Sequence, residues 1–240
     1  FCDVFCETGV FTAQEAEEIL RCGQAHGLGA KIHADEIHAI GGSQVAGKLR
    51  AVSAEHLIAA EEKEIAALAE GGTVAVLLPA TSFYLDKPFA RARDMVNAGV
   101  PVAVATDFNP GSCPSLNLQL AMNLACYKYR LRPEEVLTAV TLNAAAAIGK
   151  SNTLGTLEPG KQADILIWNA PDLDYVFYRF GSNHSYFGHE VYVGNNGSVT
   201  TLCTQALHNG LQGLTLSLSL CRKSHYLGTR RRNALGLGHG

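Results

Sequence analysis

The chain has 240 residues, of which 47% are hydrophobic and 17% are charged. This composition is typical of a folded globular protein and excludes a fibrous or wholly disordered chain. The formal net charge is only −3, so no overall positive field favours nucleic acid or an anionic membrane as a partner. No apolar run reaches the roughly 18 residues that a membrane span needs. A small molecule is therefore the expected substrate.

Seven cysteines are scattered along the chain without CxxC pairs or the dense spacing of a disulfide framework. Buried thiols in a reducing compartment explain this pattern better than disulfide bonds do. We therefore expect the protein to be cytoplasmic.

Residues 1–150 alternate short apolar runs with amphipathic segments. The expected strands lie at 2–6, up to His33, up to His56, at 73–79 and at 100–105. The expected helices begin after the capping box at Thr12 and end near 26–27, and then cover 43–49, 62–70 and 89–98. Repeated strand and helix units with apolar strands predict an α/β fold with a parallel sheet or barrel. Five strands are too few for a closed eight-stranded barrel.

The pattern changes after residue 107. Two helices are expected at 116–129 and 133–148, the second with Pro133 in its first turn. A tight turn at 160–164 followed by a strand up to Trp168 predicts a small β-rich annex over 151–196. Residues 197–240 contain no Asp or Glu and end in a basic cluster, which indicates a disordered or out-of-frame tail. A nucleic-acid-binding arm is a weaker alternative, because the cluster lacks interleaved aromatic residues.

Polar side chains stand at the ends of three expected strands: His33, His56 and Asp107. The carboxyl ends of parallel strands share one edge of the sheet, where α/β folds place their active sites. Two imidazoles and a carboxylate at this edge favour a metal-dependent hydrolase. Glu36 follows His33 by three residues, and there its carboxylate could reach a substrate or move a proton.

Structural alternatives stand beside these interpretations. His33 could be a hydrogen-bonded core histidine, and the residues beside His56, Ser53 and Glu55, could cap a helix. Asp35 could be a buried structural acid.

Covalent catalysis is a further alternative at the same loop. Ser112 lacks the flanking glycines of a nucleophile elbow. Cys113 precedes Pro114 at an expected helix start, a position typical of a structural cysteine. The sequence therefore favours metal-activated water over a covalent nucleophile.

Four segments occur in an order shared with one enzyme family: 31–36 (KIHADE), 53–57 (SAEHL), 76–79 (VLLP) and 105–112 (ATDFNPGS). They resemble the imidazolonepropionase family, the amidohydrolases of histidine degradation. The resemblance covers residues 1–194. The segment at 106–112 is specific to this family, whereas the turn at 160–164 is shared across amidohydrolases.

The resemblance implies a metal-dependent (β/α)8 barrel with a small β-sandwich, of which this chain would supply about strands 4 to 8. It implies hydrolysis of 4-imidazolone-5-propanoate to N-formimino-L-glutamate by a water that one ion, Zn or Fe, activates. It also suggests a homodimer.

The resemblance further implies a role for each site residue. His33 would be a metal ligand, and Asp107 would be a second ligand that also accepts the proton of the attacking water. Glu36 would hydrogen-bond the imidazolone ring, and His56 would stabilise the charge that develops on the attacked carbonyl oxygen. The residues expected to line the substrate pocket are Asn109, Gly111 and Ser112.

The chain departs from the family's pattern at its start. The HxH pair of the first strand, the first three strands, and the arginine and tyrosine expected to grip the propionate are missing from it. We therefore expect a C-terminal portion of such an enzyme, inactive in isolation. The alternatives are another metal-dependent amidohydrolase, acting on a purine, pyrimidine or triazine, and a non-catalytic fragment.

Overall fold

The computed structural model describes residues 1–185. Their strands form one parallel sheet in the order β1-β2-β3-β4-β5, so each strand pairs with the next along the chain. This confirms the parallel α/β sheet predicted from the sequence. The strands are β1 (Cys2–Cys6), β2 (Ala30–Ala34), β3 (Ser53–His56), β4 (Val74–Leu77) and β5 (Val102–Val104).

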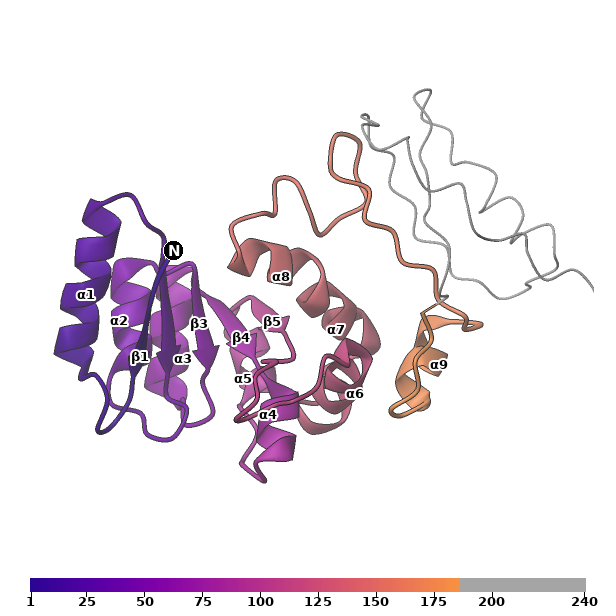
Figure 1. The fold of residues 1–240 in the computed structure, drawn as a ribbon, viewed down its shortest axis with the longest axis horizontal. Coiled ribbons are helices and arrows are strands. Elements are labelled where there is room, and N and C mark those ends of the chain that lie inside the picture. Colours follow the sequence, from indigo (N-terminus) through magenta and orange to yellow (C-terminus); the bar gives the residue numbers. More distant parts are fainter. Residues whose placement is uncertain (186–240) are drawn as a thin grey trace, which may run out of the picture.

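Helices follow the strands in turn (Figure 1). The first, α1 (Ala13–Ala25), begins at the predicted capping box, in which Thr12 and Glu15 each bond the other's backbone N–H. The remaining helices are α2 (Gly42–Leu49), α3 (Glu62–Gly71), α4 (Pro79–Tyr84), α5 (Ala92–Asn97), α6 (Leu118–Lys128), α7 (Pro133–Val140), α8 (Leu142–Ala147) and α9 (Leu173–Tyr178).

The two faces of the sheet differ in what covers them. Because side chains alternate along a strand, Val4, Ile32 and Ala54 share one face and belong to the main core. Helices α1 and α2 pack against this face at β1 and β2. The apolar residues of this core have little exposed area, and burying their side chains is the main favourable contribution to folding.

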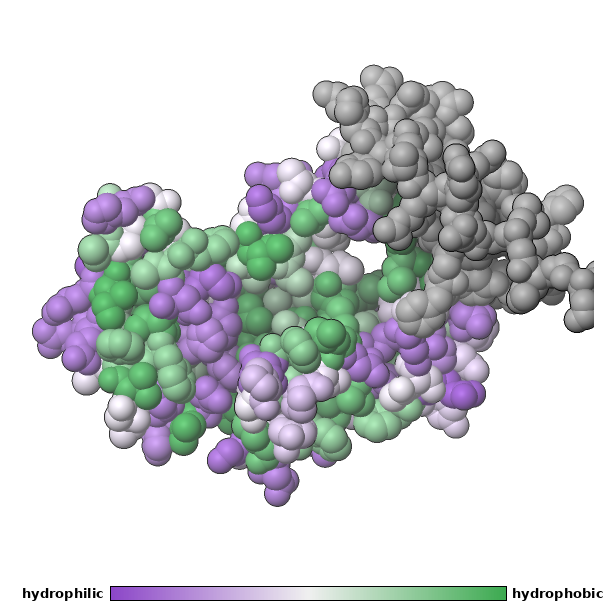
Figure 2. Space-filling view, viewed as in Figure 1, coloured by the Kyte–Doolittle hydropathy of each residue, from purple (hydrophilic) through white to green (hydrophobic). Residues whose placement is uncertain are grey.

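The opposite face changes character from one strand to the next. At β4 and β5 it carries a small apolar cluster around Val74, Val76 and Ala103, and helix α8 covers it with Ala147. At β1, β2 and β3 the same face carries charged and polar side chains. In Figure 2 a hydrophilic area lies near β3, beside a hydrophobic area near β4. The polar residues of this face are Asp3, Lys31, His33, Ser53 and Glu55.

Two sequence predictions need correction. The helix predicted at 133–148 is broken into α7 and α8 at Thr141, whose backbone has φ −121° and ψ −88°. The Thr141 hydroxyl donates to the carbonyl of Leu137 at 2.7 Å, a local bond that competes with regular helix geometry.

The strand predicted up to Trp168 is also not formed within the described residues. Trp168 makes an isolated antiparallel bridge with Ser185, and the segment before it alternates in exposure without a neighbouring strand. An extended segment becomes a strand only when its N–H and C=O groups find a partner. Within 151–185 the regular element is instead α9. The predicted division at 150 stays a prediction, and the tail at 197–240 lies outside the described residues.

Among residues 1–185, no helix combines the length and the apolar character needed to cross a membrane.

Candidate active site

The polar half of the sheet face is centred on His33 of β2. Its Nδ1 lies 3.1 Å from Oδ1 and 3.0 Å from Oδ2 of Asp3, which belongs to the neighbouring strand β1. The hydrogen bond to Asp3 raises the pKa of His33 above its ordinary value, while burial opposes the shift. The contact orients the ring and leaves Nε2 as the nitrogen directed to other partners.

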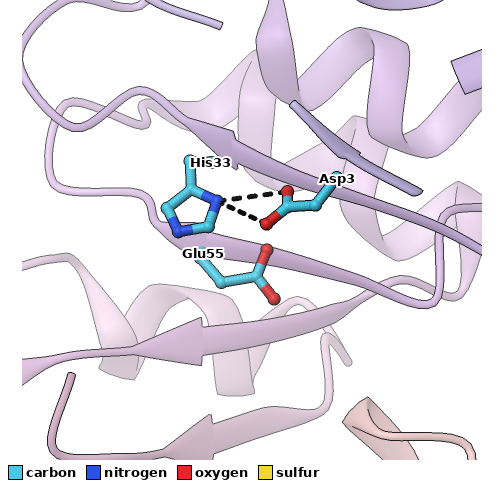
Figure 3. A group of neighbouring side chains, drawn as sticks. All are labelled: Asp3, His33 and Glu55. Atoms are coloured by element: carbon cyan, nitrogen blue, oxygen red, sulfur yellow. Dashed lines mark hydrogen bonds and ion pairs between the residues drawn. The ribbon is translucent and has the colours of Figure 1, made fainter. Parts of the chain in front are cut away.

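Glu55 of β3, the strand on the other side of β2, lies beside the pair of His33 and Asp3 (Figure 3). It is 7% exposed, and its Oε1 receives Lys31 Nζ at 2.9 Å and the Ser53 hydroxyl at 2.5 Å. Its second oxygen, Oε2, is buried without a hydrogen-bond partner. A buried carboxylate oxygen in this state is costly unless a cation or donor reaches it.

Asp3, His33 and Glu55 form a group that could hold a metal ion. One donor atom from each lies within 4.8 Å of the other two. An imidazole and two carboxylates are ligands that both zinc and iron accept. Of this group the sequence analysis identified His33 and missed Asp3 and Glu55.

A signal for these two residues was present in the sequence. Asp3, Lys31 and Glu55 are charged residues within strands rather than at their ends, and the register of the sheet places them on one face with His33.

His56 and Glu36 meet beside this group. His56 ends β3 with a positive φ of 72°, and its Nε2 lies 3.6 Å from Glu36 Oε2. The ring centroids of His56 and His33 are 5.5 Å apart. Burial lowers the pKa of His56 and raises the pKa of Glu36, and the negative charge of Asp107 opposes the first shift and adds to the second. The structure thus brings together three of the predicted site residues, His33, His56 and Glu36.

A cavity of about 290 Å³ opens at this point. Asp3, His33 and Glu36 line it together with Val4 and Phe5 of β1. Its volume is at the lower end of the range of small-molecule sites.

Asp107 lies in the loop after β5, again with a positive φ, 57°. Its Oδ2 accepts the Thr81 hydroxyl at 2.7 Å and the Ser112 hydroxyl at 3.2 Å. It is not in the group with donor atoms within 4.8 Å. Three strand spacings of about 4.8 Å separate β5 from β2 along the sheet. Asp107 and His33 are therefore not on neighbouring strands, and an ion held by both would have to lie in the space in front of this face. The charge of Asp107 nevertheless contributes to raising the pKa of His33.

The predicted pocket residues organise the Asp107 loop. Asn109 Oδ1 accepts the backbone N–H of Gly111 at 2.9 Å and of Ser112 at 2.7 Å, while its Nδ2 donates to the Asp107 carbonyl at 2.8 Å. The Ser112 hydroxyl donates to Asp107 and accepts from Asn109. These contacts stabilise the strained backbone at Asp107.

The sequence left open that Ser53 and Glu55 cap a helix and that Asp35 is a buried structural acid. Ser53 and Glu55 lie in β3 and cap no helix. Asp35 is fully buried, and Ser43 donates to it, which confirms the structural acid. Burial raises the pKa of Asp35 to about 6.

A covalent nucleophile finds little support. Cys113 is 2% exposed and pairs through its backbone with Asn109. The Ser112 hydroxyl is occupied by Asp107.

Residues 11–204 match the model of the amidohydrolase family. Curated relatives named imidazolonepropionase include those of Thermoanaerobacter pseudethanolicus, 51% identical over 184 residues, and Alkaliphilus metalliredigens, 48% identical over 185 residues. Each alignment covers 77% of this chain and 44% of the relative. The chain therefore spans less than half the length of the curated relatives it matches.

Solved structures resemble the fold at lower identity. An adenosine deaminase from Xanthomonas campestris with bound zinc has a TM-score of 0.57 at 23% identity, over 65% of this chain and 40% of the other. A variant of atrazine chlorohydrolase from Arthrobacter aurescens, complexed with zinc and atraton, has a TM-score of 0.63 at 19% identity, over 76% of this chain and 47% of the other. At this identity the likeness shows the fold alone.

Proposed function

The chain belongs to the amidohydrolase family, and we propose that it serves in the hydrolysis of 4-imidazolone-5-propanoate to N-formimino-L-glutamate. The observation that carries the proposal is the meeting of three side chains on the polar half of the sheet face: His33 and Glu36 line one cavity, and His56 contacts both of them. The identity of about half of all aligned residues to imidazolonepropionases supports the choice of substrate. In this proposal the five strands are about strands 4 to 8 of a (β/α)8 barrel, and the polar half faces its interior.

The imidazole of His33 and the carboxylates of Asp3 and Glu55 beside it suit one metal ion, Zn or Fe. The Asp3 carboxylate on Nδ1 of His33 is the contact by which proteins orient a ligating imidazole, and the unpartnered Oε2 of Glu55 provides negative charge beside it. We propose that His33 and Asp107 hold the ion. When bound, the ion lowers the pKa of the attacking water and polarises the carbonyl of the cyclic amide.

Each remaining site residue has its own role in the proposed reaction. Asp107 accepts the proton of the attacking water, and the Thr81 and Ser112 hydroxyls that donate to it fix its orientation. His56, buried and next to Glu36, stabilises negative charge on the attacked oxygen. Glu36 accepts a hydrogen bond from the imidazolone ring. Asn109, Gly111 and Ser112 shape the pocket rim beyond Asp107, and the homodimer stays a prediction.

The test is an assay of imidazolonepropionate hydrolysis with added Zn or Fe on two proteins. One is this chain alone. The other is the relative from Thermoanaerobacter pseudethanolicus with its matching segment replaced by residues 1–185 of this chain. The joined protein is expected to hydrolyse the substrate, and Asp107→Asn to lower kcat by about a thousandfold.

The matched control is Glu64→Gln, a buried carboxylate on α3 away from the cavity, which is expected to leave kcat and KM unchanged. A folded, metal-loaded joined protein without activity on this substrate would overturn the proposal, and so would activity on adenosine or a triazine instead.

A further inference from the structure

Glu7, directly after β1, is a buried carboxylate with no part in the chemistry proposed above. It is 2% exposed. Its Oε1 accepts the backbone N–H of Thr8 at 2.8 Å and faces Nδ1 of His38 at 2.9 Å. Its Oε2 accepts the backbone N–H of Ile37 at 2.9 Å and of His38 at 3.1 Å. Both oxygens are thus fully engaged, and most of their partners belong to another loop.

That loop, residues 35–41, connects β2 to α2 and carries Glu36. Its two ends are fixed by backbone geometry: Asp35 has a φ of 51° and Gly41 a φ of 106°. Just beyond it, a Cβ on Gly42 would come within 2.6 Å of the Ala34 side chain, so glycine allows α2 to begin close against β2.

At residues 37 and 38 the loop has little apolar packing of its own. Ile37 is 57% exposed, and the His38 side chain is 61% exposed, so apolar packing contributes little there. The contacts from Glu7 connect Ile37 and His38 to the end of β1, while Ile40 further along the loop packs against the core. The Glu7 contacts act on the two residues that follow Glu36.

We infer that Glu7 is a positioning residue that holds Glu36 against His56 at the cavity. Charge-assisted hydrogen bonds from a carboxylate to backbone N–H groups are among the strongest in proteins. With Ile37 and His38 fixed by them, the Glu36 carboxylate is directed to Nε2 of His56, 3.6 Å away, and to the cavity it lines. The role of Glu36 in catalysis rests on the proposed function, whereas its placement by Glu7 does not.

The test uses the full chain without substrate, labelled with ¹⁵N. Hydrogen exchange of the Ile37 and His38 amides measures the loop, and the ring signals of His56 measure whether Glu36 stays beside it. Glu36→Gln gives the reference change of the His56 signals. Glu7→Ala is expected to speed exchange at the two amides about tenfold or more and to move the His56 signals in the direction that Glu36→Gln moves them.

Two further variants separate positioning from general destabilisation. Glu7→Gln keeps one acceptor oxygen for the loop, so its effects are expected to fall between those of Glu7→Ala and the unsubstituted chain, and it serves as the test where the alanine variant does not fold. Glu64→Ala removes a carboxylate that is equally buried, at 1% exposure, and that accepts from Gln44 and the Glu61 backbone on α2 and α3. It is expected to lower stability and leave the His56 signals in place.

Unchanged His56 signals in both Glu7 variants would overturn the inference, as would an equal change in Glu64→Ala. The hydrolysis assay has no part in this result. Failure of the proposed function and failure of the inference are therefore distinguishable.

Discussion

One face of the sheet contains two regions that differ in the kind of side chain they carry. At β4 and β5 it is apolar, closed by α8, and centred on Val76. At β1 to β3 it holds two adjacent charged pairs, Lys31 with Glu55 and His33 with Asp3. The apolar half gains stability from burial alone, whereas the polar half needs every charge to have its partner. The apolar half thus stabilises the fold, whereas the polar half carries the proposed site at a cost in stability.

The largest effect is expected from breaking the pair of Lys31 and Glu55 in the polar half. Glu55→Ala removes the charged partner of Lys31, which is 19% exposed, and leaves its ammonium group with only the neutral oxygens of Ser53 and Ala147. We expect a loss of about 2–3 kcal/mol in the free energy of unfolding, measured by urea denaturation.

The double variant Lys31→Met, Glu55→Leu is the control for this comparison. Replacing both charges by apolar side chains is expected to recover stability to within about 1 kcal/mol of the unsubstituted chain. If the single and double variants were equally unstable, the ion pair would not be the reason for the loss.

A smaller effect is expected in the apolar half. Val76→Ala deletes two methyl groups under α8 and is expected to cost about 1–2 kcal/mol, again by urea denaturation. Because Val76 lies outside the polar half, metal affinity measured by calorimetry should stay unchanged. A change in metal affinity in Val76→Ala would show that the two halves are not separate.

The smallest effect is expected from an ion pair outside this face. Arg93 contacts Glu135 of α7 through two bonds, 3.0 and 2.6 Å long. Hydrogen bonds from the Arg93 guanidinium lower the pKa of Glu135 from 4.5 to about 2, although burial opposes them. Because the folded pKa is depressed, the stabilisation is present above the unfolded pKa and is lost as the pH falls from 4.5 toward about 2.

Glu135→Gln should therefore cost about 1 kcal/mol near neutral pH, and the difference from the unsubstituted chain should shrink in acid. Urea denaturation at a series of pH values measures it. A difference that stayed constant down to about pH 2 would contradict the assignment.

Much of the sheet was predictable because its signals are local. Apolar runs and the cap at Thr12 predicted the strands and α1. The strand ends also drew attention to His33 and His56, whose rings the structure places 5.5 Å apart and whose roles stay predictions. Asp3 was missed because its role depends on which strand lies beside β2, which periodicity alone does not say.

The two errors of secondary structure have different causes, one long-range and one local. The strand before Trp168 failed because a strand needs a partner, and within the described residues Trp168 pairs with Ser185 alone. The break at Thr141 follows from a side-chain bond to the backbone of Leu137, which competes with helical geometry at a position where residue type alone permits a continuous helix.

The central claim is that the polar half of the face is a metal centre that includes His33. The most direct measurement is an anomalous difference map from crystals of the chain grown with zinc. We expect a peak about 2 Å from the Nε2 atom of His33, lost in His33→Ala and retained in Val76→Ala. Zinc bound elsewhere, or an unchanged peak in His33→Ala, would contradict it.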